Sequence, residues 1–493
     1  MIETVTRLTR RRLLRWCVAL VILGIAVATV AHSATTGGDF RLSIWYPGQA
    51  MFHGRDPYDI ASFERYYGVH QVEAFSKGWF PLYGPIHLWL AVVFGLFPVA
   101  LASALWFVMN LGGLLAIASV AARALDRRLG GPAILAIAGF LVLSRPGRAT
   151  LETGQATAFY ALITYVAWSQ VRRRPWLAAV ALACALGKPP FGLPLLALIL
   201  ARRSWPVVLR AIAIFVAASL PIVIWLSVNA GSPAVLGRAV IHNLRYTDHN
   251  PLDAPGSPGR IDGLSLIARY VHGHFGGGVE VGAFVVVVGL AAVFVSRASC
   301  RPGWPLTPAV VLLLGVATVL CVAHEYYDLL LMAWPFATAL RQPVARVVDR
   351  MGIFDRSGAD GGTGTGVGAR DGPGPRAGVF DSGRFLDERQ MLRDGGAWGG
   401  VLALCALPAL IVTVIPANDT VKVLGLGSGT AVISTITTAC LLVAMVGAMV
   451  VIAFDHPQEV SAADGGDAHD VASSDGLSSV ARSVAGTVAG GIV

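Results

Sequence analysis

The chain has 493 residues, of which 55% are hydrophobic and only 14% are charged, and its mean hydropathy is +0.65. A soluble protein carries about 25% charged residues, so this composition excludes an ordinary soluble enzyme. The net charge of +9 does not indicate nucleic-acid binding, because the arginines cluster at the ends of apolar runs, as the positive-inside rule expects of cytoplasmic loops.

The first apolar run, residues 14–31, has five arginines before or at its start, at positions 7, 10, 11, 12 and 15. His32-Ser33-Ala34 is a poor cleavage site, so we expect a retained signal anchor rather than a cleaved signal. Further basic clusters stand at 123–128, 172–174, 202–203 and 341–350. With all of them placed in the cytoplasm, residues 33–83 and 229–278 become two large outer loops.

Repeated apolar runs of about 17–25 residues predict an all-α polytopic membrane protein of about twelve transmembrane helices. Residues 85–98 are too short to span comfortably and predict a re-entrant or interfacial helix before a true span that starts at Val99. Lys188-Pro189-Pro190 predicts a break between two short helices, because proline removes a backbone donor and clashes with the preceding turn. The later predicted spans include 207–228, 279–297, 304–322 and 325–340.

Four segments follow from this pattern. We expect a transmembrane core at 1–341, a Gly-rich and disordered cytoplasmic loop at 342–397, two further spans within 398–454 and an acidic disordered tail at 455–493.

Cysteines and histidines give no sign of a metal site. The six cysteines lie in apolar spans or at their edges without a CxxC pair, so neither a disulfide nor a metal is expected. His272 and His274 are interpreted as loop residues, because no carboxylate or cysteine stands at a suitable spacing.

Polar residues collect at breaks between spans on the predicted outer face. Polar groups at membrane depth are expensive and usually line a site or a pathway. Several on the same side therefore indicate a functional site. Its members are Asp39 with Arg55, Asp56 and Tyr58, Glu152 with Gln155, Lys188, and His324 with Tyr326 and Tyr327.

Each cluster also has a structural interpretation. Asp39 is either the N-cap of a helix that starts near Phe40 or a general base for a hydroxyl nucleophile. The segment from Arg55 to Tyr58 reads locally as a turn. Lys188 either snorkels to the interface or binds a phosphate, and His324 is either a helix-end residue bonded to the backbone or a site residue.

Several motifs occur in a fixed order: Asp-Phe after the first span, GRDPYD, FPLYGP, LWFVMN, GQ before a span, GKPPFGLPLL and HEYYDLLLMAWPF. This order resembles the polyprenyl-phosphate-sugar-dependent membrane glycosyltransferases of family 87, which have the GT-C fold. The resemblance covers about residues 14–340 and two C-terminal spans. The chain departs from the pattern at PLYGP, where Tyr-Pro-Pro is usual, and at Ala156, where Asn is usual. The identity of the transferred sugar therefore does not follow from the resemblance.

The resemblance implies an inverting transfer of a sugar from a polyprenyl-phosphate donor. Mannose is the favoured sugar, and arabinofuranose is the second candidate. The acceptor would be a hydroxyl group of a cell-envelope glycolipid or polysaccharide outside the plasma membrane, with both termini in the cytoplasm. No cofactor or metal is required. Asp39 and His324 become the expected catalytic residues. The expected donor- or acceptor-binding residues are Arg55, Asp56, Tyr58, Glu152, Gln155, Lys188, Arg245, Tyr326 and Tyr327.

A transporter or flippase of lipid-linked sugars is the main alternative, since transporters use discontinuous helices. Against it, the polar residues gather on the outer side rather than at the midplane, and no motif recurs in a second copy. A non-catalytic membrane scaffold is a third possibility, but it leaves the clustering on one side unexplained.

Overall fold

A computed structural model describes residues 2–34, 38–59, 83–247, 257, 259–271, 275, 277–299, 306–322, 324–350, 398–414 and 429–454. Only the backbone is described for 2–12, 31–34, 38, 244–247, 347–350, 413–414 and 429. Within these residues the regular structure is helical, apart from one isolated bridge between Arg260 and Glu325. The predicted all-α class is therefore confirmed. Residues 351–397 and 455–493, predicted to be disordered, lie outside the described residues.

Five described helices are long and apolar enough to cross a membrane. They are α1 (Ile2–Ala34), α7 (Val99–Leu125), α13 (Trp205–Asn229), α16 (Gly277–Ser299) and α22 (Gly429–Phe454). A sixth candidate is a pair of helices, α8 (Gly131–Leu143) and α9 (Arg145–Thr153), bent by 71°. The chain is thus a polytopic membrane protein.

Shorter apolar helices fill the space between these spans. They are η2 (Pro85–His87) with α6 (Leu88–Gly95), α11 (Pro175–Ala185), α12 (Pro189–Ala201), α17 (Pro308–Leu320) and α20 (Trp398–Val414). Each is shorter than the roughly 20 residues that a straight span needs. The predicted short helix after Pro85 is confirmed, whereas the count of about twelve crossings stays a prediction.

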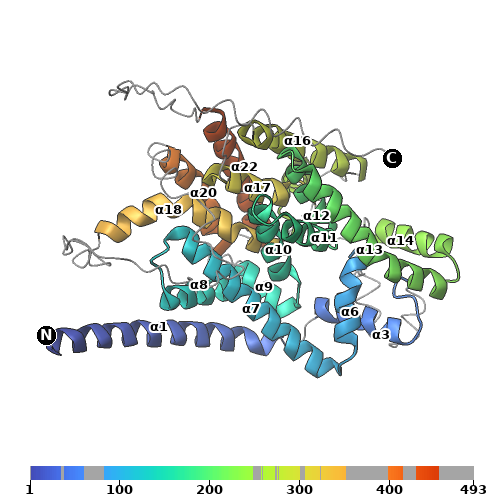
Figure 1. The fold of residues 1–493 in the computed structure, drawn as a ribbon, viewed down its shortest axis with the longest axis horizontal. Coiled ribbons are helices and arrows are strands. Elements are labelled where there is room, and N and C mark those ends of the chain that lie inside the picture. Colours follow the sequence, from blue (N-terminus) through green and yellow to red (C-terminus); the bar gives the residue numbers. More distant parts are fainter. Residues whose placement is uncertain are drawn as a thin grey trace, which may run out of the picture. The chain divides into compact units, whose positions relative to one another are not determined.

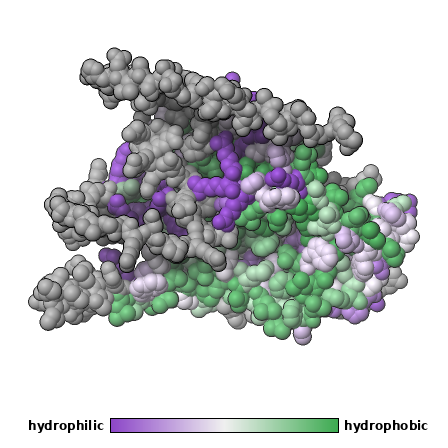
Figure 2. Space-filling view, viewed as in Figure 1, coloured by the Kyte–Doolittle hydropathy of each residue, from purple (hydrophilic) through white to green (hydrophobic). Residues whose placement is uncertain are grey.

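Packing places α17 at the centre of the bundle, because nearly every residue of this helix is buried. It contacts α22, α16 and α18 (Ala333–Arg350), and α1 packs along α8 (Figure 1). Large apolar side chains stay exposed along α13 and α16, for example Leu209, Val216 and Val285. Figure 2 shows apolar residues over much of the described surface, as contact with lipid chains requires.

The break at Lys188 is confirmed. Helix α11 ends at Ala185 and α12 begins at Pro189, whose ring suits the first position of a helix. Lys188 has an extended backbone (φ −117°, ψ 93°), because the residue before a proline avoids helical angles. The lysine side chain is thereby fixed at the junction of two helices.

A second break separates α8 from α9. Ser144 is extended and caps α9, since its Oγ accepts a hydrogen bond from the backbone N–H of Gly147 at 3.2 Å. Pro146 occupies the first turn of α9. The bend directs α9 away from the axis of α8 and carries Arg145 and Glu152 on a helix of their own.

The segment predicted as a span at 325–340 has two parts. A tight helix, η3 (Tyr326–Met332), leads into α18, which continues to Arg350 beyond the predicted end of the core. Two helices also lie in the second predicted outer loop, α14 (Pro233–Thr247) and α15 (Gly263–Val271).

Candidate functional site

Asp39 lies in the short helix α2 (Gly38–Phe40), which continues through one π-helical turn, η1 (Arg41–Trp45), into α3 (Tyr46–Phe52). The Oδ2 atom of Asp39 accepts a hydrogen bond from Nε2 of Gln155 at 2.7 Å. In turn, Oε1 of Gln155 accepts a hydrogen bond from the Tyr83 hydroxyl at 3.1 Å. Two predicted site residues, 116 positions apart, are therefore in direct contact.

An aromatic contact holds this pair in place. Phe40 stacks on Trp106 with ring centroids 5.3 Å apart, and Nε1 of Trp106 donates to the carbonyl of Gly154 at 2.7 Å. Gly154 has φ +75°, and a Cβ there would lie 2.6 Å from Cβ of Phe40. Only glycine combines this angle with such a close approach. Asp39 and Gln155 are the sequence neighbours of Phe40 and Gly154, so this contact brings their side chains together.

Asp328 is the centre of a second cluster. Nζ of Lys188 lies 2.7 Å from Oδ1 of Asp328, and the Thr157 hydroxyl donates to the same oxygen at 2.9 Å. Nδ1 of His324 lies 2.8 Å from Oδ2. The Lys188 and Asp328 side chains are only 10% and 4% exposed, so this ion pair is buried.

Asp328 was not among the residues predicted from the sequence, although it lies within the HEYYD motif. Its signal was the spacing of four residues from His324. Lys188 was predicted to meet a phosphate, and the structure gives its ammonium group a carboxylate partner instead. The rings of Phe191 and Tyr327 also face the ammonium, with centroids at 4.8 and 5.3 Å. A lysine buried in this way does not snorkel to the interface.

A buried aromatic wall connects the two clusters. Tyr83 stacks on His87 with ring centroids 4.0 Å apart, and Nδ1 of His87 is hydrogen-bonded to the Tyr160 hydroxyl at 2.7 Å. The ring of Tyr160 packs on that of Phe191 with centroids 5.8 Å apart, and Phe191 also faces Lys188. This wall was not predicted from the sequence, because His87 and Tyr160 look like isolated polar residues within apolar helices.

The segment around Asp56 forms a turn, as its local sequence indicates. Oδ1 of Asp56 accepts a hydrogen bond from the backbone N–H of Tyr58 at 2.9 Å, an Asx-turn. Burial raises the pKa of Asp56, and that hydrogen bond opposes part of the rise. The Tyr58 hydroxyl donates to the carbonyl of Tyr83 at 3.1 Å, so the turn supports the wall from outside. Arg55 is half-buried beside this turn.

The remaining predicted residues are spread around these clusters. Glu152 pairs with Arg148 along α9 at 2.6 Å, and both side chains are partly exposed. Tyr326 lies beneath the guanidinium of Arg145, whose Cζ is 4.1 Å from the ring centroid. Arg245 belongs to α14, but its side chain lies outside the described part of the chain.

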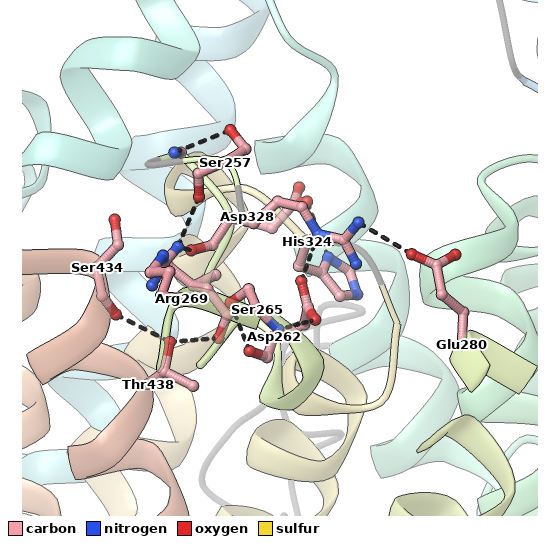
Figure 3. A network of polar contacts seen from close by, with 12 residues as sticks. Ser257, Asp262, Ser265, Arg269, Glu280, His324, Asp328, Ser434 and Thr438 are labelled. Atoms are coloured by element: carbon pink, nitrogen blue, oxygen red, sulfur yellow. Dashed lines mark hydrogen bonds and ion pairs between the residues drawn. The ribbon is translucent and has the colours of Figure 1, made fainter. Parts of the chain in front are cut away.

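A short antiparallel contact fixes the backbone of His324. The backbone N–H of Ile261 donates to the carbonyl of His324 at 2.9 Å, and the N–H of Tyr326 donates to that of Gly259 at 3.2 Å. We call residues 257 and 259–262 the strap. Thr438 of α22 donates to the carbonyl of Ile261 at 2.9 Å, so the last helix supports the strap (Figure 3).

A buried arginine holds the far side of the strap. Nε of Arg260 lies 2.7 Å from Asp262 and its Nη1 lies 3.0 Å from Glu280. Burial opposes the charge of Arg260, but the two carboxylates outweigh burial and raise its pKa. The pairing therefore anchors the strap to α16.

No group of three or more His, Cys, Asp or Glu side chains among the described residues is arranged to hold a metal ion.

Comparison with known proteins adds one match. The family model described as Glycosyltransferase family 87 matches residues 80–324. No curated protein and no solved structure matches the chain. The matched region contains Gln155 and Lys188 and ends at His324, whereas Asp39 and Asp328 lie outside it.

Proposed function

From the premise that this chain belongs to glycosyltransferase family 87 through residues 80–324, we propose that it transfers a sugar from a polyprenyl-phosphate donor. Mannose is the favoured sugar and arabinofuranose the second candidate. The acceptor is a hydroxyl group of a cell-envelope glycolipid or polysaccharide. The fold would be of the GT-C type with about twelve membrane helices. The site would face outward across the plasma membrane, with both chain termini in the cytoplasm.

One observation carries this proposal. Asp39 and the Lys188–Asp328–His324 cluster, which come from distant parts of the sequence, lie at the same aromatic wall. The Tyr83 hydroxyl bonds Gln155, the partner of Asp39, and Tyr83 also experiences the charges of both Asp39 and Asp328. Such convergence of carboxylates, a histidine and aromatic rings on a membrane enzyme is what sugar transfer to a hydroxyl needs.

The mechanism assigns Asp39 as the general base. Its carboxylate takes the proton of the acceptor hydroxyl while that oxygen attacks the anomeric carbon of the donor sugar. The bond between the anomeric carbon and the phosphate oxygen breaks, and its electron pair leaves on the lipid phosphate. Attack opposite the leaving group inverts the anomeric configuration. Gln155 keeps the carboxylate oriented through a neutral hydrogen bond, which leaves its negative charge in place.

Asp328 takes a positioning function in this proposal. A carboxylate bonded to Nδ1 orients the imidazole and leaves its Nε2 edge for another partner. That edge lies 3.3 Å from the carbonyl of Pro190, next to the break at Lys188. Tyr326 and Tyr327 follow His324 directly and offer ring faces, which stack well on the C–H faces of sugars.

The transporter interpretation draws support from the broken helix pair α11 and α12. The family match is with glycosyltransferases, however, and the chain is a membrane glycosyltransferase on that ground. The broken pair serves in this proposal to place Lys188 beside Asp328 rather than to open a pathway.

The proposal is tested with the purified full-length chain in lipid nanodiscs. Polyprenyl-phosphate mannose and polyprenyl-phosphate arabinofuranose are offered separately with defined glycolipid acceptors, and the product linkage and anomeric configuration are determined. We expect transfer from one of the two donors with inversion. Transfer from a nucleotide sugar alone, or from neither lipid donor with any acceptor, would contradict the proposal.

A further inference from the structure

Arg145, at the bend between α8 and α9, is a buried cation with neutral partners. The residue as a whole is only 8% exposed. Nη2 donates to the hydroxyl of Ser434 at 3.3 Å, and Tyr326 lies under the guanidinium plane. Nη1 has no hydrogen-bond partner among the described residues. A buried charge with an unused donor is costly unless something pairs with it.

Arg269 belongs to α15, in the second predicted outer loop, and its side chain reaches the same helix, α22, as that of Arg145. Nη1 donates to the hydroxyl of Thr435 at 3.3 Å, and Nη2 donates to the carbonyls of Ser257, at 2.7 Å, and of Arg260. Nε has no partner within the described part of the chain. Figure 3 shows Arg269 between Ser257 of the strap and Ser434 of α22.

The two arginines therefore meet at one turn of α22. Their hydroxyl partners, Ser434 and Thr435, are consecutive residues, and the two guanidinium groups are close enough to repel each other. Each also keeps one buried N–H donor unused. An anion bound between them would remove the repulsion and bring acceptors for unused donors. Phosphate suits a pair of arginines best, because its oxygens match the planar fork of arginine.

Nearby carboxylates do not take this place. Asp262, which attracts Arg269, is held by Arg260 at 2.7 Å. Glu325 lies near enough to attract Arg145 electrostatically, but Nη1 of Arg145 has no hydrogen bond to it.

We propose that Arg145 and Arg269 bind the phosphate group of the lipid-linked donor. This inference rests on the proposed function and adds the leaving-group side of the same site. Tyr326 connects the two sides, since its ring packs on Arg145 while its hydroxyl experiences the charge of Asp39. The base and the phosphate would thus lie near the same aromatic residue. Lys188, the cation predicted for this task, is already paired with Asp328.

The test measures binding of a short-chain polyprenyl phosphate, which is also the expected product, to the purified full-length chain in nanodiscs. Binding is followed by the ligand-induced rise in Tm, which needs no turnover. We expect Arg145→Gln and Arg269→Gln each to raise Kd about tenfold or more, the effect of losing a charge-assisted hydrogen bond. Arg145→Lys should recover part of the affinity. Polyprenol of the same length should bind the wild type and the variants equally.

Arg210→Gln is the matched control. Arg210 also lies over an aromatic ring, with its Cζ 4.7 Å from the ring centroid of Trp176, but it belongs to α13, which carries none of the site residues named above. It should leave Kd unchanged. If Arg145→Gln does not fold, as judged by gel filtration, the half-buried Arg269 supplies the decisive variant.

The outcomes separate the two proposals. Equal Kd values for wild type, Arg145→Gln and Arg269→Gln would overturn the phosphate site even if sugar transfer is found. Competition by inorganic phosphate or phosphatidylglycerol as strong as that by polyprenyl phosphate would overturn the donor assignment and leave a general anion site. Arginine-dependent binding of polyprenyl phosphate without transfer from any lipid donor would instead contradict the proposed function and leave the site standing.

Discussion

The buried ion pair between Lys188 and Asp328 makes the strongest single prediction. Asp328→Asn preserves the size of the side chain and one oxygen acceptor but removes the charge. Lys188 would then be left as an uncompensated cation in an environment where its side chain is 10% exposed. His324 would lose the carboxylate that orients its Nδ1 edge, 2.8 Å away.

The magnitude follows from burial. Removing one partner of a buried ion pair typically costs about 3–5 kcal/mol. The amide oxygen of Asn can still accept the hydrogen bond of Thr157, so we expect about 3 kcal/mol for Asp328→Asn. Lys188→Met leaves the carboxylate with His324 and Thr157 and should cost about 2–3 kcal/mol. The double variant removes both charges, and its cost should fall short of the sum by about 2 kcal/mol.

The assay is a double-mutant cycle on the free energy of unfolding in mixed micelles, together with kcat and KM for the donor. We expect coupling in stability and a loss of kcat in Asp328→Asn, because His324 is no longer held. Strictly additive costs in the two single variants and the double variant would refute the ion pair. An unchanged kcat in a folded Asp328→Asn protein would refute the positioning function.

Three further predictions concern the base, a glycine and the topology. Asp39→Asn should lower kcat by about 10²–10⁴-fold with the fold intact, since Asn cannot take a proton; activity within a few-fold of wild type in the transfer assay would favour a capping function, because Asn caps helices as well as Asp. Gly154→Ala should destabilise the protein by about 1–3 kcal/mol, because φ is +75° and Phe40 blocks the added carbon. Gly112→Ala, with open space around it, is the control. An equal Tm for both variants would speak against the close approach of Gly154 and Phe40. A cysteine placed at Ser357 should resist labelling from outside the cell, and efficient outside labelling would reverse the predicted topology.

The helix break at Lys188 was predictable because its cause is local. Proline at 189 interrupts an apolar run, and chain geometry alone forces the preceding helix to end there. Composition likewise predicted a polytopic helical protein, since only helices and closed barrels satisfy backbone groups in lipid. The number of crossings did not follow as securely, because helices such as α11 and α12 are shorter than a straight span.

Local sequence also singled out several polar residues, but it predicted neither their pairing nor Asp328. Asp39, Gln155, Lys188 and His324 stood out because charged and amide groups at helix breaks within apolar sequence are costly. Their partners were not predictable in the same way.

The sequence by itself determined the membrane-embedded helical class, the helix break at Lys188 and part of the set of buried polar residues, because these depend on hydrophobicity and on backbone chemistry within a few residues. Only the tertiary structure decided that Asp328 neutralises Lys188 and that Arg145 and Arg269 meet at α22. Those contacts join residues more than a hundred positions apart. Such pairing depends on how bent helices pack in three dimensions, which no local pattern specifies.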